Sequence, residues 1–145
     1  MAIDRLLGLA CRKIQIYDQD IGQLKLETPS RLDALKRVLQ GPEQDALQIA
    51  VRDATALRKV HPLLNNLLTT YSHRLLAQQT SEQLAHLRDS MILVDDRHAL
   101  IRFDHDQARS KLLIDEADEV RPYLIRFAEI LSEGGESISS STLGL

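Results

Sequence analysis

The sequence has few of the residues on which disulfide-rich or aromatic-rich folds depend. Its 145 residues include no tryptophan, two phenylalanines, three tyrosines and a single cysteine. One cysteine cannot form an intramolecular disulfide, so we expect a protein of the reducing cytoplasm rather than a secreted one. Because aromatic side chains are so few, leucine, isoleucine and valine have to supply most of the buried apolar surface.

Strong charge and targeting signals are also missing. The formal net charge of −3 excludes a broad electrostatic attraction to nucleic acid, so phosphate binding would need a local patch. The apolar N-terminal stretch is interrupted by Asp4 and Arg5 and is too short to cross a bilayer, so we expect neither a signal peptide nor a membrane anchor. Glycine-rich phosphate loops, paired cysteines and histidines at zinc-binding spacing do not occur, and we expect no cofactor and no metal site.

A chain of this length builds one hydrophobic core. We expect one domain over residues 1–133 and a flexible serine-rich tail over residues 134–145. Apolar spacing of period two predicts strands in residues 12–18, 46–53, 74–79, 91–94, 100–103 and 111–115. Helical spacing predicts helices in residues 1–10, 29–40, 54–73 with a bend near Pro62, and 119–133. Two segments stay open: residues 18–30 form a strand or an irregular loop, and residues 80–87 form a helical turn or a loop.

The segment 88-RDSMILVDDRHALIRFD-104 predicts a β-hairpin, because two apolar runs flank a charged turn. Preceded by a strand, a helix, the strand 47-LQIAVRD-53 and a further strand, it resembles one half of the phospholipase D superfamily. In that family a His-x-Lys pair is followed by four spacer residues and an aspartate, beside a strand ending in Val-Asp. If the last position is matched to Asp95, the histidine position falls on Arg88 and the lysine position on Ser90. Pairing His86 with Arg88 instead moves the aspartate position to Leu93.

This resemblance implies an α/β fold, a phospholipase-D-like single domain with a mixed β-sheet flanked by helices. It argues against the reaction, because the family's histidine attacks phosphorus and forms a covalent intermediate that neither arginine nor serine reproduces without another base. The chain is also similar, over nearly all of residues 1 to 133, to a small uncharacterised bacterial domain associated with acetyltransferase domains. It contains no glycine-rich loop for coenzyme A.

Polar residues follow several predicted strands, and in open α/β sheets the carboxyl ends of strands border the usual ligand crevice. Aspartate is equally a turn and cap residue, and structural duty is the favoured interpretation for most of these positions. The arginines near the hairpin alternate with aspartates, which predicts ion pairs on a solvated face. We assign no catalytic residue and no metal ligand. The candidate binding residues are Asp18, Asp53, His86, Arg88, Ser90, Asp95 and Arg102.

The leading hypothesis is a catalytically inactive, phospholipase-D-like binding or interaction module that forms a two-fold homodimer. A protein partner is the first class of ligand, and phosphate or nucleic acid is a less favoured one. The first alternative is a phosphodiesterase or nuclease with a non-standard site, in which His86 is the nucleophile and Arg88 and Asp95 support it. The second alternative is an all-helical adaptor, in which the predicted strands are pieces of helix.

Overall fold

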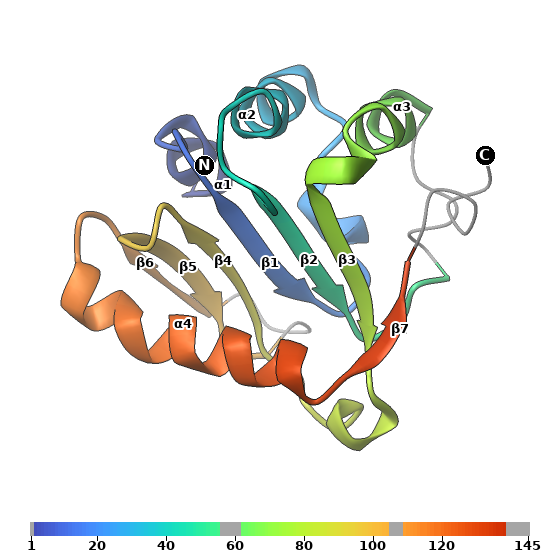
Figure 1. Cartoon of the computed structure of the whole chain (residues 1–145). Coiled ribbons are helices and arrows are strands. Elements are labelled where there is room, and N and C mark those ends of the chain that lie inside the picture. The colour runs from blue at the N-terminus through green and yellow to red at the C-terminus, as the bar shows by residue number, and fades with distance from the viewer. Residues whose placement is uncertain (1, 56–61, 105–108, 139–145) are drawn as a thin grey trace.

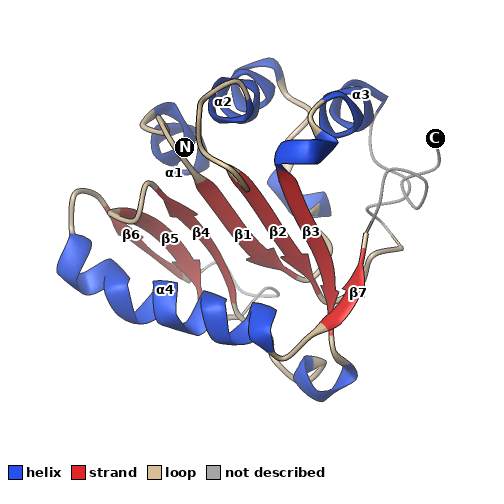
Figure 2. Ribbon diagram, viewed as in Figure 1, coloured by secondary structure: helices blue, strands red, loops and turns tan. Residues whose placement is uncertain are grey.

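A mixed seven-stranded sheet organises the chain, with the strand order β6-β5-β4-β1-β2-β3-β7 and helices on both faces (Figures 1 and 2). The structure is a computed structural model that describes residues 2–55, 62–104 and 109–138. The predicted α/β class, with helices on both sides of a mixed sheet, is confirmed. The all-helical alternative is wrong, because the predicted strands pair with one another.

The elements follow one another as strands and helices of ordinary length. The strands are β1 (Ile14–Asp18), β2 (Leu47–Val51), β3 (Leu75–Thr80), β4 (Ser90–Val94), β5 (His98–Arg102), β6 (Ser110–Leu113) and β7 (Gly135–Ser137). The helices are α1 (Ala2–Gly8), α2 (Pro29–Leu39), α3 (Pro62–Thr70) and α4 (Ala117–Ser132). Strands β1, β2 and β3 run parallel, whereas β4, β5, β6 and β7 each pair antiparallel with their neighbours.

The sheet separates two apolar cores, because successive side chains of a strand point to opposite faces. Ile14 and Ile16 of β1 pack with the leucines of α1, α2 and α3, whereas Tyr17 faces the other side. On that side α4 packs against β3, β4 and β5 and buries Phe127 completely (Figure 1). Each such fully buried side chain contributes about 1.5–3 kcal/mol, so leucine and isoleucine supply the stability that aromatic residues supply elsewhere.

Of the two structures left open for residues 18–30, the irregular loop is the one observed: it runs from the end of β1 to the start of α2 and contains a 3-10 turn at Gly22–Leu24. The predicted helix over residues 54–73 is shorter: α3 begins at Pro62, and residues 56–61 lie outside the described residues. Before that gap, the Asp53 Oδ1 atom accepts the backbone N–H of Thr55 at 2.9 Å, a turn that competes with a helix start.

The C-terminal part also differs from the expected tail. Strand β7 pairs with β3, and Ile138 is buried in the core beneath α3, so the folded part continues past residue 133. The turn into β7 depends on Gly135, whose φ of 144° and whose approach to the Gln79 carbonyl leave no room for a side chain. The remainder of the expected tail, residues 139–145, lies outside the described residues.

Candidate functional site

A row of polar side chains crosses four neighbouring strands at one end of the sheet. Arg102 of β5 pairs with Ser90 of β4 on one side and with Ser110 of β6 on the other. Continuing the β1–β4 register beyond Tyr17 and Met91 places Asp18 opposite Ser90. Side chains at paired positions share a face, so Asp18, Ser90, Arg102 and Ser110 form one polar row.

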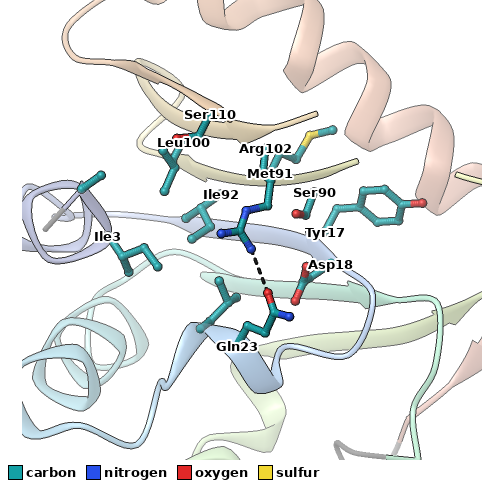
Figure 3. A pocket seen from close by; sticks show the side chains of 12 residues that line it. Ile3, Tyr17, Asp18, Gln23, Ser90, Met91, Ile92, Leu100, Arg102 and Ser110 are labelled. Atoms are coloured by element: carbon teal, nitrogen blue, oxygen red, sulfur yellow. Dashed lines mark hydrogen bonds between the residues drawn. The ribbon is translucent and has the colours of Figure 1, made fainter. Parts of the chain in front are cut away.

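The polar row lines a pocket of about 330 Å³ on the sheet face that carries α1. Ile92 and Leu100, two residues further along β4 and β5, supply apolar wall on the same face. Ile3 of α1 and Leu24 of the Gly22–Leu24 turn close the opposite side. Figure 3 shows the Arg102 guanidinium between these apolar side chains and the Asp18 carboxylate. The site therefore combines one carboxylate, one guanidinium and an apolar wall.

The charged members of the row are held in place by hydrogen bonds to the loop after β1. Asp18 is 6% exposed, and its Oδ2 atom accepts the backbone N–H of Ile21 at 2.9 Å. Arg102 donates from Nη1 to Gln23 Oε1 at 2.8 Å, the bond drawn in Figure 3. Since both partners belong to the same loop, the loop sets the positions of the two charges together.

The pocket wall opposite the sheet is fixed by Arg31 of α2. Its Nη1 atom donates to the Leu24 carbonyl at 2.6 Å, and its Nε atom donates to Asp4 Oδ1 of α1 at 2.8 Å. This contact lowers the pKa of the Asp4 carboxyl below its usual value, because the Arg31 hydrogen bond favours the ionised form. One buried arginine therefore ties α1 and the Gly22–Leu24 turn to each other.

Three of the candidate residues predicted from sequence, Asp18, Ser90 and Arg102, meet in this pocket. Arg88 and His86 precede β4 and are exposed, and the Arg88 Nε atom lies 3.1 Å from Asp104 Oδ2. Asp53 is exposed after β2. These three residues do not line the pocket. Arg88 comes nearest to the polar row in the sequence, two residues before Ser90.

Asp95 lies at the opposite end of the sheet from the pocket. Strand β4 runs antiparallel to β1, so Ser90 stands at the carboxyl end of β1 and Asp95 beyond its amino end. The Asp95 carboxylate accepts the backbone N–H groups of Cys11, Arg12 and Lys13 at 2.9, 2.8 and 2.9 Å. It connects the α1–β1 loop to the β4–β5 turn, and the structure does not bring it together with Ser90.

A second polar network lies behind the polar row, on the face covered by α4. Arg126 of α4 holds the Asp89 carboxylate with two bonds, of 3.1 and 2.9 Å. Arg52 donates from Nη1 to the Asp89 carbonyl at 2.7 Å, and its guanidinium carbon stands 5.1 Å from the centre of the Tyr17 ring. Burial raises the pKa of Tyr17, and the nearby Arg52 charge opposes that rise in part. The network anchors the start of β4 between Arg88 and Ser90.

Sequence reasoning missed the pocket residues Gln23 and Ser110 and the Arg52–Asp89–Arg126 network. The pairing of Ser110 with Arg102 follows from strand order, whereas the Gln23 contact follows from the path of an irregular loop. Among the described residues, no three acidic, histidine or cysteine side chains gather in a way that could hold a metal ion. No described helix is both long and apolar enough to cross a bilayer.

Comparison with known proteins places this architecture in a family. A family model described as a domain of unknown function (DUF7931) matches residues 1–138. The chain belongs to this family. Its match extends to the last described residue, Ile138, and so includes β7. No curated protein matches the chain.

Two solved structures are similar in fold. One is Nuc from Salmonella typhimurium, a phospholipase D family member, with a TM-score of 0.57 and 13% identity over 93% of this chain and 87% of Nuc. The other is TrmBL2, an archaeal chromatin protein described as showing a novel mode of DNA binding, with a TM-score of 0.62 and 12% identity over 92% of this chain. The chain spans about half of TrmBL2, 48% of its length. At such identities the likeness shows a phospholipase-D-like fold and nothing more about activity.

Proposed function

We propose that the chain is a phospholipase-D-like binding module that lacks the phosphodiesterase reaction and acts as a two-fold homodimer. The observation that carries this proposal is the occupancy of the motif positions at and just before the start of β4, where Arg88 and Ser90 stand in place of histidine and lysine. An arginine side chain stays protonated and cannot attack phosphorus, and a serine needs a base to do so. Asp95, at the third motif position, is bound to three backbone N–H groups at the other end of the sheet.

Without the phosphodiesterase reaction, the function that we propose is ligand binding at the polar row. Asp18 and Ser90 are buried and Arg102 is half-buried, at the edge of the sheet where the parallel strands β1 and β2 have their carboxyl ends and where ligands of α/β folds usually bind. Placing a carboxylate and a guanidinium on an otherwise apolar face costs free energy, and a ligand that binds both charges would offset part of that cost. This argument supports a binding function for the pocket and does not require any step of catalysis.

The test of this proposal combines an activity assay with a measurement of mass. We expect the full chain to leave chromogenic phosphodiesters and DNA uncleaved, and to elute as a dimer in light scattering at tens of micromolar. Cleavage that His86→Ala abolishes would establish the nuclease alternative and refute the loss of catalysis. A monomer at that concentration would refute the dimer and leave the binding site untouched.

Nucleic acid is the second candidate ligand, and the DNA-binding description of TrmBL2 together with the exposed Arg88 favours testing it. Arg88 already contacts Asp104 at 3.1 Å, so a phosphate would have to replace that carboxylate. If DNA binds here, fluorescence anisotropy should give an affinity that falls steeply with salt and weakens in Arg88→Ala. The matched control is Arg121→Ala, which removes another exposed arginine, from α4.

A further inference from the structure

We propose that the pocket lined by the polar row binds a small zwitterion with an apolar body, of which an aliphatic or aromatic α-amino acid is the simplest example. This inference rests on the proposed binding function and names its ligand. The pocket presents one carboxylate, Asp18, and one guanidinium, Arg102, to the same space. A ligand with one ammonium and one carboxylate matches both.

The balance of charge separates this ligand from a phosphate. A phosphate on Arg102 would face the Asp18 carboxylate in the same small pocket, and like charges at short range repel each other. Asp18 is 6% exposed, and its Oδ1 atom has no hydrogen-bond donor among the described residues, whereas Oδ2 is bound to the Ile21 amide. A ligand ammonium beside Oδ1 would pair with the Asp18 carboxylate, whereas a dianion at the same place would be repelled by it.

The spacing of the row suits a ligand whose two charges are close together. Asp18 and Arg102 lie on β1 and β5, with β4 between them, so their backbones are about 10 Å apart, twice the usual strand spacing. The long arginine side chain covers more of that distance than the short aspartate does. Ser90, midway between them on β4, can donate or accept a hydrogen bond to either charged group.

The apolar wall accounts for the other end of the ligand. Ile92 and Leu100 continue the pocket from Ser90 and Arg102 toward the interior, and Ile3 and Leu24 face them. A volume of about 330 Å³ is at the lower end of the range for small-molecule sites, roughly 300–1,000 Å³. An amino-acid side chain inside these walls would leave both of its charges at the polar row.

Isothermal titration of the full chain with L-leucine and L-phenylalanine tests the proposal directly. We expect binding of both and much weaker binding of glycine, which has the charges without the apolar body. Leucine amide lacks the carboxylate and N-acetylleucine lacks the ammonium, so each should bind at least about tenfold more weakly than leucine, since each loses one charged contact. Inorganic phosphate is the remaining probe, and we expect it not to compete with leucine.

Two conservative variants link the charges to the ligand groups. Asp18→Asn should weaken leucine binding by about tenfold or more while leaving N-acetylleucine unaffected, because the lost contact is the one to the ammonium. Arg102→Gln should weaken leucine binding similarly and leave leucine amide unaffected. Arg121→Gln removes an exposed charge far from the pocket and should change neither affinity. Circular dichroism melts of all three confirm that the fold is retained.

Several outcomes would overturn the inference. No binding of either amino acid at millimolar concentration would do so, as would affinities that are equal in Asp18→Asn and the unmodified chain. Phosphate binding that depends on Arg102 would show that the ligand is an anion, and the proposed binding function would survive that result. Cleavage of phosphodiesters would refute the proposed function instead, so the two failures are distinguishable.

Discussion

The buried Asp95 carboxylate should contribute more to stability than Asp96, the other acid of the β4–β5 turn. It accepts three backbone N–H groups, from Cys11, Arg12 and Lys13, that lie more than 80 residues away in sequence. Hydrogen bonds to a charged group contribute about 1.5–3 kcal/mol each, and three partly buried ones at the low end of that range amount to about 4.5 kcal/mol. Asp95 also has a φ of 54°, so alanine at this position adds backbone strain of about 1 kcal/mol.

A domain of this size is stable by only about 5–15 kcal/mol, so Asp95→Ala removes a large part of its stability. The decisive variant is therefore Asp95→Asn, which keeps a residue tolerant of positive φ and one acceptor oxygen. It loses the charge and turns an amide NH₂ toward one of the three donors. We expect its free energy of unfolding to fall by about 2–3 kcal/mol.

Asp96→Asn is the matched control, because Asp96 has a similar φ of 62° in the same turn. Its carboxylate is 41% exposed and forms ion pairs with Lys13 at 2.9 Å and Arg12 at 3.7 Å, contacts worth at most about 1 kcal/mol at the surface. Urea unfolding followed by circular dichroism measures both variants at constant m-value. Equal losses in Asp95→Asn and Asp96→Asn would refute the argument, since the backbone bonds would then contribute nothing.

Two further predictions concern Tyr17 and Gly135. The raised pKa of Tyr17 means that the folded state holds the proton more tightly than the unfolded state, so stability is fully present below pH 10.0 and falls as pH rises above it. In urea unfolding at alkaline pH, Tyr17→Phe should remove part of that decline, and an unchanged decline would contradict this. A Cβ at Gly135 would lie 1.9 Å from the Gln79 carbonyl oxygen, so Gly135→Ala should detach β7 and expose its amides to hydrogen exchange. Gly134→Ala, whose Cβ meets nothing within 4 Å, should cost only the strain of its positive φ, about 1 kcal/mol, and leave β7 protected.

The fold was predictable where a segment's own pattern determines its structure. The alternation in residues 91–103 predicts the hairpin because β4 and β5 are adjacent in both sequence and space. The turn between them suits aspartate, since Asp95 and Asp96 both adopt positive φ and aspartate tolerates that region better than most residues. Strand β7 was not predictable in this way. Its residues have no strand pattern, and pairing with β3 decides their conformation.

Only part of the candidate site was predicted, because a sequence does not show in which direction each strand runs. Residues that follow apolar strands share one edge of a sheet only if the strands are parallel. This holds for Asp18 and Asp53 after β1 and β2, but β4 runs the other way. Asp95 therefore stands at the far edge, whereas Ser90, the first residue of β4, joins Asp18. The same reversal brings Arg102 to the pocket, because an antiparallel hairpin returns its last residue to the level of its first.

The polar row also bears on why this fold would keep a pocket at all. One step deeper on the same strands, Ile92 and Leu100 show that apolar side chains fit this face. The side chains on the next position, Asp18 and Ser90, are nonetheless polar, although they are only 6% and 7% exposed. A buried carboxylate lowers stability unless it is fully paired. The Ile21 amide donates to one Asp18 oxygen, so the Asp18 carboxylate also holds the loop after β1 in place. A ligand that pairs with Asp18 and Arg102 would offset part of the free energy that keeping these charges on an apolar face costs, the usual relation between stability and function at a binding site.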